Sequence, residues 1–284
     1  MPLLYGALQK GENMDKTYRL VSRSYKNENT VVKIGSAAVG NGFTVIAGPC
    51  SVESREQIIS TAFSVKKAGA DILRGGVFKP RSSPYDFQGP GKIGFEWLNE
   101  AKKASCLPVV SEITDPSEIE LFTNVDAFQV GARNMWNFEL LKALGKTDKP
   151  VLLKRGPASR LDELLCAAEY IAVGGNMNII LCERGIRTFS DSSRFTLDLS
   201  AVPVLKSLTH LPVIVDPSHA SGDARFVGSL ACAAAACGCD GVMIESHINA
   251  SEALCDASQA VSPEELEKII AKMREIRKVL DEDR

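Results

Sequence analysis

The chain has 284 residues, of which 45% are hydrophobic and 24% are charged, and its formal net charge is −2. These values exclude a collagen-like, coiled-coil or mainly disordered chain, and the charge balance argues against a general nucleic-acid binder. No run of about 18 apolar residues would span a membrane, and residues 1–20 show no signal peptide, so a cytoplasmic location is expected.

The first 40 residues are predicted to form an N-terminal extension. Two short runs, Tyr18–Ser22 and Thr30–Ile34, have the composition of strands, and the polar stretch Tyr25–Asn29 separates them. We expect them to form a β-hairpin that caps the bottom of the following domain, which takes up residues 41–284.

Eight short apolar runs then alternate with helical patterns. The strand candidates are Phe43–Ala47, Asp71–Arg74, Pro108–Glu112, Ala127–Val130, Val151–Lys154, Asn178–Cys182, Pro212–Val215 and Val242–Glu245. The clearest helical patterns are Glu56–Ala68, Phe95–Ala104, Asp162–Val173, Ala224–Ala236 and Pro263–Leu280. Strands that are apolar throughout are typical of a parallel sheet that is buried on both faces.

Eight strand–helix units in about 240 residues indicate an α/β fold and match the TIM (β/α)8 barrel. The alternative is a doubly wound open sheet. No glycine-rich dinucleotide-binding segment follows the first strand, which disfavours that alternative.

In a TIM barrel the active site lies where the strands end. The predicted strand ends carry seven cationic side chains: Arg74, Lys79, Arg81, Arg133, Lys154, Arg155 and Arg184. Because Arg and Lys that converge in one mouth bind anions, this pattern predicts a ligand with several negative charges, or two anionic ligands.

A second set of strand-end residues has the chemistry of metal ligands: Cys50, His219, Glu245 and the later Asp256. A thiolate, an imidazole and two carboxylates suit Mn, Fe, Co or Zn better than Mg or Ca. The alternative for His219 is a simple turn residue. The eight cysteines are expected to be reduced, because a chain of this length needs no disulfides to build a core.

Seven segments at these strand ends occur together in a fixed order: residues 47–51 (AGPCS), 74–76 (RGG), 79–82 (KPRS), 131–134 (GARN), 153–156 (LKRG), 182–185 (CERG) and 216–219 (DPSH). Through them the chain resembles the 3-deoxy-D-arabino-heptulosonate-7-phosphate (DAHP) synthases. It is most similar to the compact class that is related to the 3-deoxy-octulosonate-8-phosphate synthases, here called octulosonate synthases. The resemblance extends from about Thr17 to Ala260.

The resemblance implies a TIM-barrel enzyme that condenses phosphoenolpyruvate with erythrose 4-phosphate and releases phosphate, the first step of the shikimate pathway. It implies a divalent metal ion on Cys50, His219, Glu245 and Asp256. It also implies a homo-oligomer, either a dimer or a tetramer. Neither end of the sequence has room for the ferredoxin-like or chorismate-mutase domain of some relatives, so feedback control through a fused domain is not expected.

The resemblance also implies roles for the cationic residues. Arg133, Arg184 and the backbone of Ala132 would hold the phosphate of phosphoenolpyruvate. Its carboxylate would be held by Arg74, Lys79 and Lys154. The sugar phosphate would be held by Lys79, Pro80, Arg81 and Ser82. The residues implied to be catalytic are Lys79, Cys50 and His219, and both Lys79 and a water on the metal remain candidates for carrying protons.

Some positions depart from the family pattern, among them Trp136, Ala220 and the stretch from Cys255 to Ser258. The neighbouring Cys255 suggests a further hypothesis, namely that oxidation links Cys50 to Cys255 when metal is absent. Three alternative functions stay open: an octulosonate synthase that uses arabinose 5-phosphate, a relative with an altered aldose, and a non-catalytic barrel that binds phosphometabolites. The segment KPRS at residues 79–82 argues against the first alternative, because octulosonate synthases usually have Ala-Asn in place of Pro at this loop.

Overall fold

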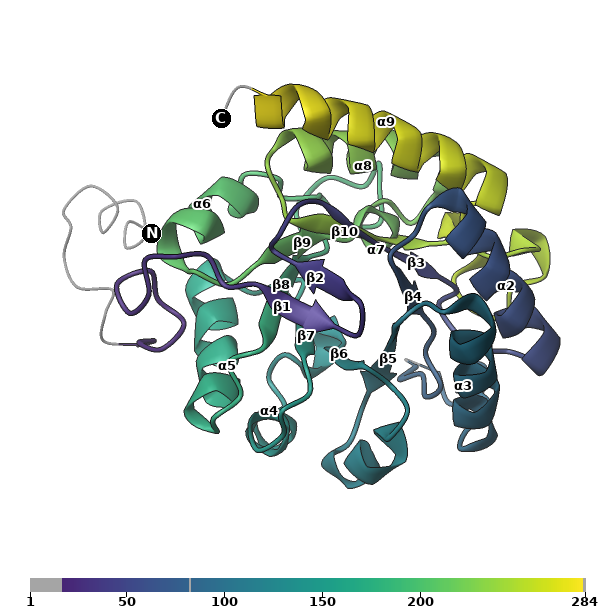
Figure 1. Cartoon of the computed structure of the whole chain (residues 1–284), viewed down its shortest axis with the longest axis horizontal. Coiled ribbons are helices and arrows are strands. Elements are labelled where there is room, and N and C mark those ends of the chain that lie inside the picture. The colour runs from purple at the N-terminus through teal and green to yellow at the C-terminus, as the bar shows by residue number, and fades with distance from the viewer. Residues whose placement is uncertain (1–16, 82, 283–284) are drawn as a thin grey trace.

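The computed structural model describes residues 17–81 and 83–282. Eight parallel strands close into a barrel in the order β10-β3-β4-β5-β6-β7-β8-β9 (Figure 1), which confirms the predicted TIM barrel. The barrel strands are β3 (Thr44–Gly48), β4 (Ile72–Arg74), β5 (Val109–Ile113), β6 (Ala127–Val130), β7 (Val151–Lys154), β8 (Ile179–Glu183), β9 (Val213–Val215) and β10 (Gly241–Glu245).

Every residue of these strands is buried, since one face lines the barrel interior and the other packs against helices. Burial on both faces explains the continuous apolar runs of the sequence. The predicted strands are confirmed, and their ends differ from the observed ends by at most one residue. The barrel closes where Gly241 of β10 lies opposite Thr44 of β3.

The helices around the barrel are α2 (Arg55–Ala68), α3 (Ile93–Ser105), α4 (Phe138–Gly145), α5 (Leu161–Val173), α6 (Ala201–Leu208), α8 (Ala224–Ala236) and α9 (Pro263–Glu282). The sequence analysis did not identify α4 and α6, whose eight residues are too few to show a clear helical period. Local signals set the ends of α2: the side chain of Ser54 accepts a hydrogen bond from the N–H of Gln57, and Gly69 ends the helix at a φ of 99°.

An antiparallel hairpin precedes the barrel and consists of β1 (Val32–Ile34) and β2 (Ala37–Val39). The predicted hairpin is therefore present, but the predicted pairing of Tyr18–Ser22 with Thr30–Ile34 is wrong. The backbone N–H groups of residues 20 and 21 donate to the carboxylate of Glu169 on α5, at 2.9 and 3.1 Å, so a helix side chain takes the place of a partner strand. Residues 1–16 of the predicted extension lie outside the described residues.

The hairpin closes the N-terminal end of the barrel, as expected. Val32, Ile34 and Val39 are fully buried in an apolar cluster to which every barrel strand contributes. The barrel members of this cluster are Ile46, Ile72, Val110, Ala127, Leu152, Ile180, Cys182, Ile214 and Met243. Because the cluster fills this end, the carboxyl ends of the strands are the end left for a site.

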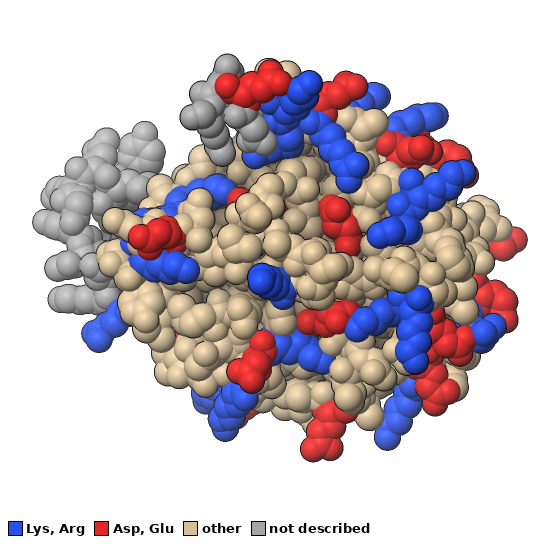
Figure 2. Space-filling model, in the orientation of Figure 1, with Lys and Arg blue, Asp and Glu red and all other residues tan. Residues whose placement is uncertain are grey.

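The face that the hairpin closes is the one seen in Figure 2. Lys and Arg side chains lie interspersed with Asp and Glu side chains in this view, and charge of one sign does not dominate it. Within the described ranges, no helix combines the length and the apolar character that a membrane crossing requires. All eight cysteines are free thiols.

Candidate active site

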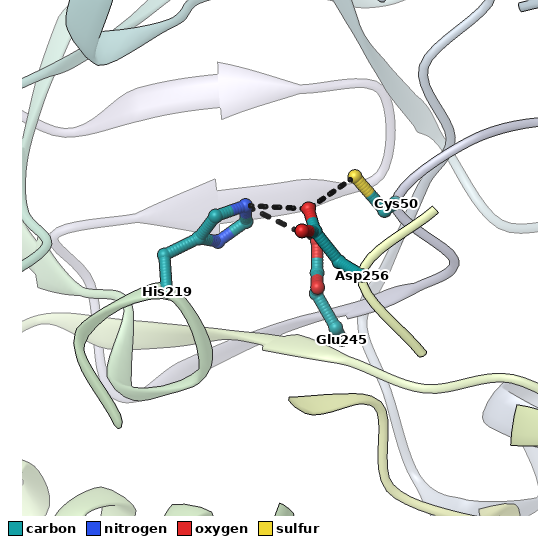
Figure 3. Close-up of side chains that lie close together, drawn as sticks. All are labelled: Cys50, His219, Glu245 and Asp256. Atoms are coloured by element: carbon teal, nitrogen blue, oxygen red, sulfur yellow. Dashed lines mark hydrogen bonds and ion pairs between the residues drawn. The ribbon is translucent and has the colours of Figure 1, made fainter. Parts of the chain in front are cut away.

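Four side chains with metal-binding chemistry meet at the carboxyl end of the barrel (Figure 3). Cys50 follows β3, His219 lies on the short helix α7 (Pro217–Ser221) after β9, Glu245 is the last residue of β10, and Asp256 lies in the loop beyond it. One donor atom of each residue lies within 4.8 Å of the donor atoms of the others. The structure thus brings together the four predicted ligands, and metal binding by them stays a prediction.

The end of β3 places the thiol of Cys50. Gly48 has a φ of 147°, and a Cβ at this position would lie 2.2 Å from the carbonyl oxygen of Arg74, so glycine is required here. The Sγ of Cys50 lies 3.1 Å from Oδ2 of Asp256 and 3.1 Å from Sγ of Cys255. The contact with Cys255 and burial raise the pKa of the Cys50 thiol, which therefore gives up a proton when it binds a metal.

Asp216 orients His219. Nδ1 of His219 lies 2.7 Å from Oδ2 of Asp216, and the backbone N–H of His219 donates to Oδ1 at 2.9 Å. Nε2 consequently faces the other candidate ligands, at 3.3 Å from Glu245 Oε1 and 3.8 Å from Asp256 Oδ2. Burial lowers the pKa of His219 and so favours the neutral ring that a metal needs. Asp216 also accepts a 2.5 Å hydrogen bond from Nζ of Lys154.

Glu245 is almost completely buried, and each of its carboxylate oxygens has a polar partner. Its Oε1 lies 2.5 Å from Arg74, and its Oε2 accepts from Gln259 at 2.6 Å. Burial favours the protonated carboxyl, but the neighbouring His219 ring and the charge of Arg74 outweigh burial and hold the pKa of Glu245 below its usual value. Arg74, which the resemblance assigns to a substrate carboxylate, is therefore engaged with a candidate metal ligand.

Asp256 completes the cluster from an unusual backbone conformation. Its φ is 54°, in the left-handed region that Asp tolerates better than most residues. Burial favours the protonated carboxyl, but His219 and the hydrogen bond from Cys50 outweigh it and hold the pKa of Asp256 well below its usual value. The carboxylate also lies 3.5 Å from the guanidinium of Arg194.

The donor set fits a divalent transition metal. It offers one sulfur, one imidazole nitrogen and two carboxylates, whereas Mg and Ca prefer oxygen alone. The carboxylate–imidazole contact of Asp216 and His219 is the usual support of a metal-binding histidine.

A cavity of about 350 Å³ opens beside His219 and Asp256. Three carboxylates line it, those of Asp86, Glu112 and Asp256. Seven cationic side chains line it: Lys79, Arg81, Arg133, Lys154, Arg184, Arg187 and Arg194. This excess of positive charge suits a ligand with several negative charges.

Five of the seven predicted cations thus converge on the cavity, and two do not line it. The prediction is wrong for Arg155, which lies in a buried ion network at 2.8 Å from Glu183 and 2.9 Å from Asp198. The other is Arg74, in its pair with Glu245. A position at the end of a strand brings a cationic side chain close to the cavity. A carboxylate on the neighbouring strand can nevertheless pair with the cation and keep it buried in the barrel wall, away from the cavity.

Lys79 forms a buried ion pair with Glu112, with Nζ 2.6 Å from Oε2. Burial disfavours the charged ammonium, but the carboxylate of Glu112 outweighs burial and raises the pKa of Lys79. Burial likewise disfavours the charged carboxylate of Glu112, but Lys79 outweighs it and lowers the pKa of that carboxyl. Both members of the pair are therefore charged at neutral pH.

The predicted phosphate-binding residues lie on two sides of the cavity. Ala132 begins a turn of 3-10 helix after β6 (Ala132–Asn134), and Arg133 is exposed at the rim, with its guanidinium 3.5 Å from the carbonyl oxygen of Pro80. Arg184 is buried, donates to the carbonyl of His219 at 3.3 Å and stacks on the ring of Phe195 at 4.3 Å.

The loop after β4 supplies the remaining predicted contacts. Pro80 and Arg81 line the cavity, and the guanidinium of Arg81 lies 2.8 Å from Sγ of Cys255. Ser82, which was predicted to bind the sugar phosphate, lies outside the described residues.

The sequence analysis missed several polar residues of the cavity wall, among them Asp86 in the loop after β4. Glu112 and Gln129 lie on β5 and β6, where the strand pattern locates them but gives no sign of their role. Arg187 and Arg194 lie in the long loop between β8 and α6, which has no motif or periodicity to mark them.

Comparison with known proteins agrees with this geometry. The family model described as the DAHP synthetase I family matches residues 24–282. The chain belongs to the DAHP synthetase I family. Among its relatives in this family is a phospho-2-dehydro-3-deoxyheptonate aldolase of Thermotoga maritima, with 46% identity over 92% of this chain and 78% of the relative. A 2-dehydro-3-deoxyphosphooctonate aldolase of Syntrophobacter fumaroxidans is more distant, with 30% identity over 87% of this chain and 91% of the relative.

Solved structures of DAHP synthases are also similar to this member of the DAHP synthetase I family. The crystal structure of the Thermotoga maritima DAHP synthase superposes with a TM-score of 0.90 at 45% identity, over 93% of this chain and 78% of the other. A truncated form of 3-deoxy-D-arabino-heptulosonate 7-phosphate synthase from the same organism superposes with a TM-score of 0.87 at 42% identity, and the match covers 93% of this chain and 98% of that form.

Proposed function

We propose that this chain condenses phosphoenolpyruvate with erythrose 4-phosphate to give 3-deoxy-D-arabino-heptulosonate 7-phosphate and phosphate, with the barrel of residues 41–284 as the catalytic domain. The observation that carries the proposal is the cationic cavity that opens onto the four-donor cluster. The 46% identity to a phospho-2-dehydro-3-deoxyheptonate aldolase supports it. Two phosphates and one carboxylate would balance the positive charge of the cavity.

Cys50, His219, Glu245 and Asp256 would hold a divalent ion of Mn, Fe, Co or Zn. When bound, such an ion polarises the aldehyde oxygen of the sugar phosphate. Asp216 contributes by holding the imidazole so that Nε2 faces the other three donors.

Phosphoenolpyruvate would lie across the cavity between β6 and β8. Arg133, Arg184 and the backbone of Ala132 would bind its phosphate. Its carboxylate would be held by Lys79 and Lys154, with the charge of Arg74 nearby. Several fixed cations at one substrate restrict its orientation, and orientation accounts for a large part of the rate in reactions that join two molecules.

Lys79 is the residue we assign to proton transfer. Nζ is protonated at neutral pH and can donate a proton to the substrate, which solvent returns after turnover, while the carboxylate of Glu112, 2.6 Å away, holds the ammonium in place. Cys50 and His219 would contribute to catalysis through the metal site.

Pro80, Arg81 and Ser82 would hold the sugar phosphate. The second candidate reaction uses arabinose 5-phosphate, and the relatives named 2-dehydro-3-deoxyphosphooctonate aldolase favour it at 30% identity. Pro80 disfavours it, because octulosonate synthases usually have Ala-Asn in place of Pro at this loop.

A phosphate-release assay tests the proposal. Phosphoenolpyruvate is supplied with either erythrose 4-phosphate or arabinose 5-phosphate, with and without a chelator. The proposal expects release with the four-carbon sugar that the chelator abolishes and Mn restores. Preference for the five-carbon sugar would assign the second reaction. Release that survives the chelator would remove the metal from the proposal, and no release with either sugar would contradict it.

A further inference from the structure

The active site contains a second thiol to which the proposed reaction gives no role. Cys255 lies in the loop after β10, directly before Asp256, and is 4% exposed. Its Sγ lies 3.1 Å from Sγ of Cys50 and 3.7 Å from Oδ2 of Asp256. Cys255 therefore contacts two of the four candidate metal ligands.

A cationic side chain lies directly beside this sulfur. The guanidinium of Arg81 lies 2.8 Å from Sγ of Cys255. A cysteine binds a metal through its sulfur and releases its proton as it does so. Cys50, Cys255 and Asp256 consequently present two sulfurs and one carboxylate oxygen to the same small volume.

The spacing of the sulfurs allows both to bind one ion. With a metal–sulfur distance of about 2.3 Å and tetrahedral angles, two thiolates on one ion lie about 3.8 Å apart. The present separation of 3.1 Å therefore has to increase by about 0.7 Å. Cys255 lies between two short turns of 3-10 helix (Ala250–Glu252 and Ala257–Gln259), outside the regular barrel, where a side-chain rotation can supply this distance.

We propose that Cys255 is a second thiolate ligand, available to thiophilic divalent cations of the zinc and cadmium type. Sulfur ligands select such ions, whereas Mn²⁺ prefers carboxylate oxygen. A thiophilic ion would bind Cys50 and Cys255 together, while Mn²⁺ would bind Cys50 without Cys255. The proposal rests on the metal site of the proposed function but not on the reaction.

Cadmium reports the number of thiolates directly, because each cadmium–thiolate bond adds charge-transfer absorption in the ultraviolet. The full chain is loaded with one equivalent of Cd²⁺ by exchange dialysis. The variants are C255S, C50S and, as a matched control, C232S, which changes a half-buried thiol on α8 away from the site. We expect the absorption per cadmium in the unmodified chain and in C232S to be about twice that in C255S and in C50S.

Affinity gives the second readout. Loss of a residue that only supports a metal ligand weakens metal binding by about tenfold or more. Loss of a direct ligand in C255S should therefore weaken Cd²⁺ binding by at least about tenfold in a chelator competition, while the Mn²⁺ affinity stays unchanged. Equal cadmium absorption in the unmodified chain and C255S would overturn the proposal. If C255S does not fold, C50S gives the test. Absorption per cadmium in C50S at about half of the value for the unmodified chain supports a second thiolate ligand, and no such absorption in C50S overturns the proposal. The experiment measures metal binding and not turnover. A result against the second thiolate therefore leaves the proposed reaction unchanged, and a failure of the phosphate-release assay leaves the second-thiolate proposal unchanged.

Discussion

Replacing Asp216 by Asn tests the electrostatic account of the site. The carboxylate accepts from the backbone N–H of His219 at Oδ1, and from Lys154 and Nδ1 of His219 at Oδ2. An Asn side chain has only one acceptor oxygen, so its NH₂ group must face at least one of these donors. The substitution also leaves the ammonium of Lys154, whose side chain is 4% exposed, without its counter-charge.

Breaking a buried ion pair from one side costs about 3–5 kcal/mol. A change of 1 kcal/mol shifts Tm by about 2–4 °C in chains of roughly this size, so D216N should lower Tm by about 6–20 °C. The loss of the carboxylate behind His219 should also weaken metal binding by about 10–100-fold. Differential scanning calorimetry and metal titration measure the two effects separately.

Two further variants identify the cause. E139Q breaks the pair of Glu139 with Lys142, which is exposed and screened by solvent, and should leave the Tm nearly unchanged. K154M combined with D216N removes both buried charges and should recover part of the lost stability. An unchanged Tm in D216N, or a double variant that is no more stable than D216N, would refute the reasoning.

Four further predictions concern the same site. C50S should lose bound Mn²⁺ and most Mn²⁺-dependent turnover, and retention of both would exclude Cys50 as a ligand. Oxidation of the metal-free chain should remove two titratable thiols, because the sulfurs of Cys50 and Cys255 lie 3.1 Å apart, whereas two thiols left free would reject the disulfide. K79M should lower turnover by about 10²–10⁴-fold with metal content unchanged, and ordinary turnover would exclude Lys79 from proton transfer. Acid unfolding gives the pH test. Carboxyls whose pKa is lowered by folding stabilise the protein above their unfolded pKa of about 4, and this stabilisation is lost as the pH falls through their lower folded pKa values. A free energy of unfolding that does not change below about pH 4 would contradict the assignments. The carboxyls concerned are Glu112, Asp216, Glu245 and Asp256.

The fold could be predicted because burial on both faces of the barrel strands leaves a strong apolar signal. The two parts that were missed or misplaced lack such a signal. The short helices α4 and α6 are below the length at which periodicity is clear. Tyr18–Ser22 has the composition of a strand, but its backbone bonds to Glu169, a residue about 150 positions away that no local pattern connects to it.

The site could be predicted only in part for a related reason. Cys50, His219 and Glu245 lie at or just after strand ends, and barrel topology alone brings strand ends together, whereas Asp256 lies farther along the loop after β10. Whether a strand-end cation faces the cavity depends on its nearest carboxylate: Arg155 pairs with Glu183 and lies in the wall. Side-chain partners of this kind are long-range contacts, which a single sequence read by itself does not reveal.

The pairing of β10 with β3 has a consequence for the synthesis of the chain. Gly241 of β10 lies opposite Thr44 of β3. The first barrel strand, β3, therefore leaves the ribosome long before β10 has been synthesised. Until then, β3 and β9 are open edges whose N–H and C=O groups can pair with other chains. A nascent or truncated chain that stops before residue 241 should therefore depend on chaperones or aggregate, even though it already contains seven of the eight barrel strands.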